Sequence, residues 1–174
     1  RLNLEVSLAS EMVELALSLR PESVCLVPEN RKEVTTEGGL DIVSNMERAR
    51  EAVGAFTDAG IPTSMFIDPN PKQLEASAQI GSPWVELHTG SFARAWYHES
   101  EREKELMILQ KGMELGVSLG LRVNAGHGIN YDNVEGAKQL DKVYEFNIGH
   151  SIVSRSITHG FKEAVATMRH RLNH

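Results

Sequence analysis

The sequence alternates six times between a short strand-like run and a longer segment with helical periodicity. Residues 23–27 form a continuous apolar run, which is typical of a strand buried on both faces. Strict alternation predicts parallel strands joined by helical crossovers. Two architectures satisfy this pattern, an open doubly wound sheet and a (β/α)8 barrel. The expected strands are residues 2–6, 23–27, 63–67, 84–88, 122–125 and 144–148.

Local signals mark several helix ends. Ser10 is a candidate N-cap for the first helix, and Pro21 ends that helix. Asn70 is expected to cap a helix that has Pro71 at its first position. The expected helices run from residue 10 to just before Pro21 and over residues 45–59, 71–80, 100–119, 133–140 and 161–172.

Polar side chains stand at the C-terminal ends of nearly every expected strand. A doubly wound sheet gathers its ligand groups at one switch point, where the strand order reverses. A barrel gathers them from all of its strands at one face. The pattern therefore favours an α/β protein of the (β/α)8 TIM-barrel type. The strand-end residues are Glu5, Glu29, Asp68, Glu86 with His88, His127 and His150.

The number of strand–helix units is smaller than a barrel requires. Eight units take about 250 residues, or about 31 each, whereas the 174 residues hold six units. The chain also starts directly in a strand-like pattern, without a methionine. We therefore expect a single domain over residues 1–174, a TIM barrel lacking its first two βα units.

Composition excludes some partners. A formal net charge of −6 leaves no basic stripe to displace counterions from nucleic acid. Small phosphorylated ligands remain compatible, because a few backbone amides can hold a phosphate. No apolar stretch is long enough to span a bilayer, and no signal peptide is apparent. Cys25 lies in an apolar run and is expected to be a reduced core residue. We expect a cytoplasmic protein.

Two consecutive strands end in the same pattern, a glycine followed by a histidine. The first is Gly126-His127-Gly128 and the second is Gly149-His150. An imidazole has a pKa near 6.5 and exchanges protons at neutral pH, while glycine lets the backbone approach an anion. Loops after the last two strands of such barrels commonly bind phosphate. A structural alternative is that these are two ordinary strand-ending turns.

Six segments together resemble pyridoxine 5′-phosphate synthases. The resemblance runs from the first residue to the last helix, in the family's order and near its spacing, and six linked motifs are far more specific than one. The segments are RLNLE at 1–5, LVPE at 26–29 with Arg31, EVTTEGGLD at 33–41, ELHTG at 86–90, VNAGHG at 123–128 and NIGH at 147–150.

The resemblance implies a (β/α)8 enzyme that forms the pyridine ring of vitamin B6. Its substrates would be 3-amino-2-oxopropyl phosphate and 1-deoxy-D-xylulose 5-phosphate, with loss of phosphate and water. Condensation and ring closure require repeated proton transfers, which carboxylates and histidines can supply. The family resemblance implies no cofactor, no metal and a homo-oligomeric assembly.

The resemblance also implies residue roles. Glu5 and His127 match acid/base residues, and Glu86 matches a residue that stabilises developing positive charge. Independently, a carboxylate inside an apolar strand is unusual unless it is paired. Thr35 matches a contact to the deoxyxylulose phosphate, in a long loop typical of a lid. Three further residues match positions that bind the aminooxopropyl phosphate: Gly128, Gly149 and His150.

Other polar or aromatic residues receive structural interpretations. In the loop, Lys32 and Glu33 are expected to be solvated, and a solvated interpretation also applies to Arg31 and Glu37. His88 is expected to orient its neighbours or to support the rim, without an assigned role. Packing or subunit contact is the expectation for an aromatic cluster formed by Phe92, Trp96 and Tyr97.

The chain departs from the family at its beginning. The family's first two strands carry an Asn-x-Asp-His stretch and a His-x-Arg pair, and neither occurs here, which argues against activity of this chain alone. One alternative is another phosphate-binding barrel, such as an isomerase or aldolase. No lysine stands at a predicted strand end, which argues against a lysine-dependent aldolase. A second alternative is a non-catalytic remnant that associates with intact subunits.

Overall fold

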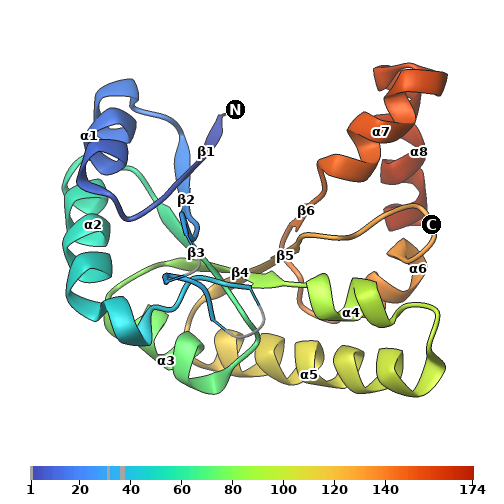
Figure 1. Ribbon diagram of the computed structural model, residues 1–174, viewed down its shortest axis with the longest axis horizontal. Helices are drawn as coiled ribbons and strands as arrows, with labels where there is room; N and C mark the ends of the chain where they lie inside the picture. Colours follow the sequence, from blue (N-terminus) through green and yellow to red (C-terminus); the bar gives the residue numbers. More distant parts are fainter. Residues whose placement is uncertain (1, 31, 36–37) are drawn as a thin grey trace.

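Six parallel strands form one sheet whose spatial order follows the chain (Figure 1). The computed structural model describes residues 2–30, 32–35 and 38–174. The sheet curves into a half-barrel, and within the described residues its edge strands are not paired with each other. The predicted barrel-type class and the six strand–helix units are confirmed. The strands are β1 (Asn3–Val6), β2 (Ser23–Leu26), β3 (Thr63–Ile67), β4 (Trp84–His88), β5 (Arg122–Gly126) and β6 (Phe146–Asn147).

Helices connect the strands and cover the convex side of the sheet, where α1, α2, α3 and α5 lie in Figure 1. The predicted cap at Asn70 is confirmed, since its side chain accepts a hydrogen bond from the backbone N–H of Lys72 at 2.9 Å. The helices are α1 (Ser10–Leu19), a 3-10 turn η1 (Val43–Asn45), α2 (Met46–Asp58), α3 (Pro71–Gln79), α4 (Gly90–Ala95), α5 (Glu99–Ser118), α6 (Val134–Ala137), α7 (His150–His159) and α8 (Phe161–Asn173).

The strands place apolar and polar side chains on opposite faces of the sheet. Side chains alternate along a strand, and the in-register parallel pairs keep residues of one parity together. Residues such as Leu26, Met65 and Leu87 join the core with the helices. The other parity brings Ser64 and Glu86 to the concave face, where they line a cavity. The fold therefore buries its apolar face and reserves its concave face for polar groups.

Several predicted elements differ from the structure. The strand expected at 144–148 is reduced to β6, and the helix expected at 133–140 is reduced to α6. Two helices were not predicted, α4 and α7. The N-cap of α1 is Ala9 rather than Ser10, and it makes no side-chain cap hydrogen bond. Cys25 is buried, as predicted.

The loop after β2 is anchored at its base, which makes the prediction of a solvated Glu33 wrong. The Glu33 carboxylate is buried, forms an ion pair with Arg48 at 3.2 Å and accepts a hydrogen bond from the Glu29 N–H at 3.0 Å. Val34 and Leu40 form an antiparallel bridge that closes the loop. Lys32 is exposed, as predicted. The other loop residues interpreted from sequence, Arg31, Thr36 and Glu37, lie outside the described residues, as does Arg1.

The aromatic cluster on α4 contributes partly to packing. Phe92 is buried and meets Trp96 edge-on, with 5.7 Å between ring centroids. Tyr97 is exposed, and its hydroxyl lies 3.3 Å from a carboxylate oxygen of Asp132. The packing interpretation is therefore confirmed for Phe92 and Trp96.

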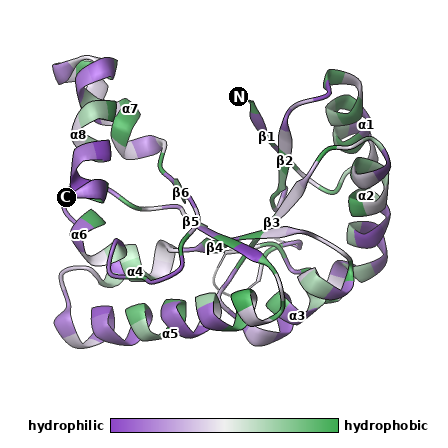
Figure 2. Ribbon diagram, turned by 180° about the vertical axis from the view of Figure 1, so that it is seen from behind, coloured by the Kyte–Doolittle hydropathy of each residue, from purple (hydrophilic) through white to green (hydrophobic). Residues whose placement is uncertain are grey.

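The α7–α8 hairpin stands away from the sheet, and its two helices pack on each other. No residue of α7 is buried. Two of its apolar side chains are exposed, Val153 at 55% and Ile157 at 83%. Green stretches of the α7 ribbon in Figure 2 mark its hydrophobic residues. Phe161 of α8 is also exposed. No helix in the described part of the chain is long and apolar enough to cross a membrane.

Candidate active site

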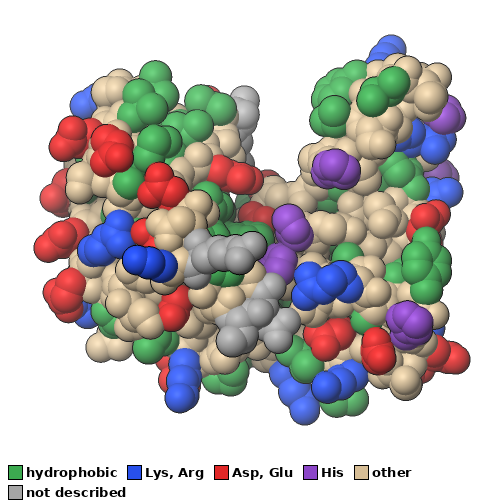
Figure 3. Space-filling model, in the orientation of Figure 1, with side chains coloured by type: hydrophobic (Ala, Val, Ile, Leu, Met, Phe, Trp, Pro, Cys, Tyr) green, Lys and Arg blue, Asp and Glu red, His purple; other side chains and the backbone are tan. Residues whose placement is uncertain are grey.

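Acid and base groups gather where β1, β4 and β5 end on the concave side of the sheet. Glu5 comes from β1, Glu86 and His88 from β4, and His127 follows β5 directly. The charge of Glu5 acts on the pKa of both Glu86 and His127, so these side chains lie within electrostatic range of Glu5. Figure 3 shows histidine side chains gathered beside the hollow on this side of the sheet. The structure therefore brings together three predicted residues: Glu5, Glu86 and His127.

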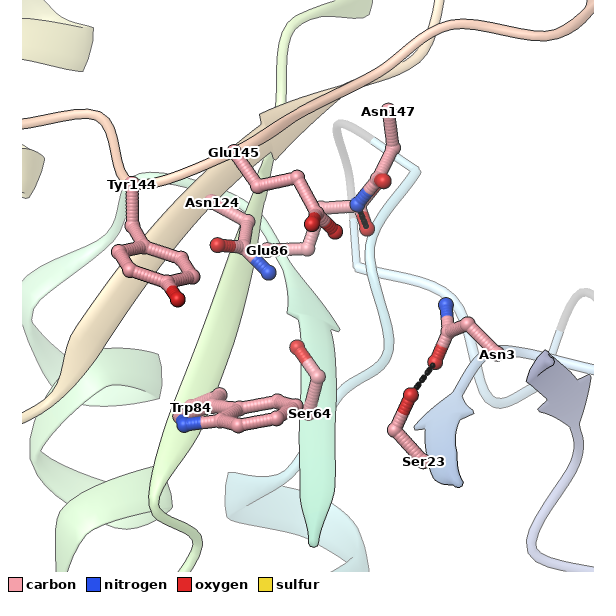
Figure 4. Close-up of a pocket in the computed structure, with 9 residues that line it drawn as sticks. All are labelled: Asn3, Ser23, Ser64, Trp84, Glu86, Asn124, Tyr144, Glu145 and Asn147. Atoms are coloured by element: carbon pink, nitrogen blue, oxygen red, sulfur yellow. Dashed lines mark hydrogen bonds between the residues drawn. The ribbon is translucent and has the colours of Figure 1, made fainter. Parts of the chain in front are cut away.

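Glu86 is a buried carboxyl with one hydrogen-bond donor. It is 5% exposed, and the side-chain amide of Asn147 donates to its Oε2 at 2.6 Å (Figure 4). Burial raises the pKa of Glu86 to about 7, and the negative charges of Glu5 and Glu145 act in the same direction, while the Asn147 bond opposes them. Burial dominates because it penalises the charged form. Glu86 is therefore an acid–base group near neutral pH.

Gly126 is required by the position of Glu86. A Cβ at Gly126 would overlap the Oε1 atom of Glu86 and lie 3.0 Å from the backbone oxygen of Asn147. Only a residue without a side chain leaves room here. The neighbouring strands β4, β5 and β6 thus each contribute one residue to a single packed unit: Glu86, Gly126 and Asn147.

A cavity of about 250 Å³ lies beside Glu86 on the concave face. Its lining includes side chains from all six strands, as Figure 4 shows, and Ser23 donates a hydrogen bond to the Asn3 side chain there at 2.8 Å. Among the described residues the buried Oδ1 atom of Asn124 has no hydrogen-bond partner. An unpartnered buried amide oxygen is costly, so this cavity suits a polar occupant.

His127 is held in a strained turn after β5. Its φ is +77°, a left-handed conformation that side chains other than glycine rarely adopt. The Thr89 hydroxyl lies 2.7 Å from the Gly126 carbonyl oxygen and 2.5 Å from that of His127. Gly128 follows with φ +80°, and a Cβ there would lie 2.7 Å from Ala93. Strain of this kind persists only where the surroundings enforce it, and it concentrates at functional sites.

The surroundings of His127 disfavour its protonated form. Burial lowers its pKa, and the positive charges of His88, Arg94 and His150 lower it further, while Glu5 raises it. The imidazole is therefore more often neutral at pH 7 than a free histidine, and it can accept a proton. The strand ends thus carry a carboxyl of raised pKa and an imidazole of lowered pKa, and perturbed pKa values of this kind are found at functional sites.

The second Gly–His segment opens α7. Gly149 is the N-cap with φ −114°, and a Cβ there would meet no atom within 4 Å. His150 is exposed, and the Ser151 hydroxyl donates to the Ile129 carbonyl at 2.9 Å, which ties α7 to the turn after β5. The two Gly–His segments are therefore neighbours, as a shared phosphate site requires.

Thr35 lies apart from the cavity at Glu86. Its backbone N–H donates to the Gly39 carbonyl at 2.8 Å, and its hydroxyl accepts from the Gly38 N–H at 3.3 Å. Thr35 instead lines a second cavity of about 300 Å³, together with Asp68 and His88. Of the predicted substrate contacts, Thr35 therefore faces a cavity other than the one at Glu86.

Sequence reasoning missed the environment of His88. Its Nδ1 atom lies 3.0 Å from Oδ1 of Asp68, and both side chains are buried. The rings of His88 and His127 are 4.9 Å apart between centroids. Alternation along β4 was the available signal, because it places His88 on the same face as Glu86. Within the described residues no group of three or more histidine, cysteine, aspartate or glutamate side chains could hold a metal ion.

The fold and these groups define an α/β half-barrel protein of TIM-barrel type, with acid–base residues at the C-terminal ends of its strands. The family model described as "Pyridoxal phosphate biosynthesis protein PdxJ" matches residues 1–174. The chain belongs to this family.

Curated relatives agree with the family assignment. The chain is 50% identical over 173 residues to pyridoxine 5′-phosphate synthase of Opitutus terrae, covering 99% of this chain and 70% of that protein. It is 50% identical over 169 residues to the protein of the same name from Prochlorococcus marinus, covering 97% and 68%. The chain therefore spans about 70% of the length of these relatives.

Solved structures support the fold. A xylose isomerase domain protein from Planctomyces limnophilus matches with a TM-score of 0.60 at 13% identity, over 98% of this chain and 71% of that one. A chain from the BexX/CysO complex of Amycolatopsis orientalis matches with a TM-score of 0.62 at 18% identity, over 91% and 57%. At these identities the similarity concerns the fold alone.

Proposed function

We propose that this chain carries out the pyridoxine 5′-phosphate synthase reaction. In this reaction 3-amino-2-oxopropyl phosphate condenses with 1-deoxy-D-xylulose 5-phosphate, which gives pyridoxine 5′-phosphate, phosphate and water. The observation that carries the proposal is that two residues matched to the family's reaction have shifted pKa values: burial raises the pKa of Glu86 to about 7 and lowers the pKa of His127. The printed name of relatives at 50% identity supports the choice of reaction.

The residue roles follow from environment. His127 and Glu5 transfer protons, because both stand at strand ends, the charge of Glu5 reaches His127, and an imidazole or a carboxylate can give or take a proton. Glu86 stabilises positive charge that develops when the amine and ketone condense. Burial keeps Glu86 partly protonated in the empty hollow, and a cationic intermediate would favour its ionised form.

The phosphate of the aminooxopropyl substrate is assigned to the two Gly–His segments. Gly149 and His150 open a ten-residue helix whose first backbone N–H groups are available to an anion. Gly128 lies at the neighbouring turn. The deoxyxylulose phosphate is assigned to Thr35. A homo-oligomeric assembly and a cytoplasmic location remain predictions.

Family membership removes the alternative of an unrelated phosphate-binding barrel. The alternative of a non-catalytic remnant is decided by an assay. The purified chain is incubated with both substrates, and pyridoxine 5′-phosphate is measured by chromatography and mass spectrometry. We expect product from the unaltered chain, and a rate at least about 100-fold lower from Glu5→Gln or His127→Asn.

Matched controls come from exposed residues of the same type. Glu51→Gln and His98→Asn alter side chains outside the hollow and should leave product formation unchanged. Circular dichroism checks that each variant is folded. Product formation at the unaltered rate by both Glu5→Gln and His127→Asn would contradict the proposal, and so would an unaltered chain that forms no product.

A further inference from the structure

A buried ion-pairing couple lies at the rim without a role in the proposed reaction. Asp68 follows β3 and is 3% exposed, and His88 ends β4 and is 6% exposed. The Nδ1 atom of His88 and Oδ1 of Asp68 are 3.0 Å apart. Two ionisable side chains removed from water are costly unless they satisfy each other. The bond also fixes the ring, because a carboxylate beside Nδ1 selects the form protonated there.

The same pair contacts one end of the loop that follows β2 and contains Thr35. The backbone N–H of Gly39 lies 3.3 Å from both carboxylate oxygens of Asp68. A Cβ at Gly38 would lie 2.9 Å from Cε1 of His88, and a Cβ at Gly39 would overlap the backbone of Ile67 and Asp68. The two glycines therefore let the loop backbone rest directly on the pair.

The opposite side of His88 supports His127. The two imidazole rings are tilted by 56° with centroids 4.9 Å apart. Phe66 meets both rings edge-on, at 5.2 Å from His88 and 6.2 Å from His127. His88 thus fills the space between the loop backbone and His127, and a displacement of one would move the other.

We propose that His88 is a positioning residue for His127, and that Asp68 holds His88 and the Gly38–Gly39 segment together, so that one buried hydrogen bond sets both the Thr35 loop and the His127 imidazole. The inference rests on the proposed function in one respect, the roles of Thr35 and His127. A misplacement of about 1 Å in an acid–base group can lower a rate by about 100-fold.

Two variants separate the contact between His88 and His127 from the contacts that Asp68 makes with His88 and Gly39. His88→Asn keeps an N–H donor for Asp68 but removes the ring that supports His127. Asp68→Asn keeps the shape but removes the charge that holds His88 and Gly39. The control is His98→Asn, at an exposed histidine. Each protein is labelled with nitrogen-15, and the imidazole of His127 and the amides of Gly39 and Thr35 are followed by NMR as pH is varied. His127→Asn identifies the His127 signal.

We expect the titration midpoint of His127 to move to higher pH in His88→Asn, because one positive neighbour is removed. The other charged groups that face His127 remain in place: Glu5 from β1, Arg94 from α4 and His150 from α7. The Gly39 amide should keep its chemical shift in His88→Asn. In Asp68→Asn both the Gly39 amide and the His127 titration should change. The control should alter neither.

Unchanged His127 titration in both variants would overturn the proposal. If circular dichroism shows that a variant is unfolded, measurements on the unaltered chain still test the proposal. Its His88 ring signals should respond at the His127 midpoint and show a nuclear Overhauser effect to the His127 ring, and the absence of both would overturn the proposal. These measurements need no turnover, so failure of the positioning role and failure of the synthase function are distinguishable.

Discussion

The two Gly–His segments have the same sequence pattern but differ in how closely their surroundings pack against them. Gly126-His127-Gly128 is held by close contacts although His127 and Gly128 are exposed: Gly126 touches Glu86, Gly128 touches Ala93, and Thr89 bonds the carbonyls of Gly126 and His127. Gly149-His150 has open space around its glycine, and it begins a helix without buried residues. The first segment is built before a ligand arrives, whereas the second is left accessible to one. Under the proposed function, the repeated motif divides the work between proton transfer and anion binding.

The largest expected effect is a loss of kcat, and it should distinguish His127 from His150. His127→Asn should lower kcat by about 100- to 10,000-fold, the usual contribution of an acid–base group. His150→Asn should instead raise KM for 3-amino-2-oxopropyl phosphate by about 10-fold, since it removes one phosphate contact worth about 1.4 kcal/mol. Steady-state kinetics with each substrate varied in turn measures both constants. Equal losses of kcat in the two variants would break the comparison.

Glu86 contacts both strand ends, because it touches Gly126 and accepts a hydrogen bond from Asn147. Its titration should dominate the pH dependence of the free energy of unfolding. Below pH 4.5 the carboxyl is protonated in both the folded and the unfolded chain. Between pH 4.5 and about 7 the unfolded chain ionises first, so the free energy of unfolding falls as pH rises. The total fall from this residue is about 3 kcal/mol, and above pH 7 it is complete.

Glu86→Gln provides the matched comparison for this pH dependence. Glutamine keeps an oxygen that accepts from Asn147 but cannot ionise. Urea denaturation at several pH values should show a flatter profile and a more stable variant at pH 8. A variant that loses as much stability as the unaltered chain between pH 5 and 8 would contradict the raised pKa of Glu86.

Substitution by alanine should destabilise the chain more at the packed glycine, Gly126, than at the open one, Gly149. Gly126→Ala should lower the free energy of unfolding by about 2 kcal/mol, because its Cβ must displace the Glu86 carboxyl and press on the Asn147 carbonyl. Gly149→Ala is the control, and it should change stability by less than about 0.5 kcal/mol. Denaturant midpoints measure both. A larger loss at Gly149 would show that the second segment is packed as tightly as the first.

The smallest effect concerns the hydroxyls that tie the segments down. Thr89→Val removes the bond to the Gly126 and His127 carbonyls and should cost about 1 kcal/mol. Ser151→Ala removes the bond to Ile129 and should cost about 0.5 kcal/mol, because its surroundings are more exposed. Thermal unfolding of the two variants orders them. The reverse order would mean that α7, rather than the turn after β5, holds the two segments together.

Local signals in the sequence were sufficient for most of the fold. Strands 63–67 and 84–88 were predicted with the bounds observed, because their apolar runs are bounded by clear turn residues. The cap at Asn70 followed from Pro71 beside it. Glu86 was singled out as a carboxylate in an apolar strand, and the structure confirms its burial.

The errors concern partners that are distant in the chain. Glu33 was expected in solvent, but Arg48 of α2 pairs with it across the loop. His88 received no role, because its partner Asp68 ends the preceding strand, twenty residues earlier. The Asn147 donor lies 61 residues beyond Glu86. Sequence pattern identifies which residues share a face, but it does not show which side chains meet.

Because no residue of α7 is buried, hydrogen exchange in this helix can report on anion binding. A helix without buried residues, packed on one neighbouring helix and following a two-residue strand, opens locally at little cost in free energy. Its amide hydrogens should therefore exchange with deuterium faster than those of β4 and β5. An anion bound by Gly149 and His150 would stabilise the first turn and slow that exchange. Deuterium uptake by α7 then measures occupancy of the phosphate site directly, without any chemical turnover.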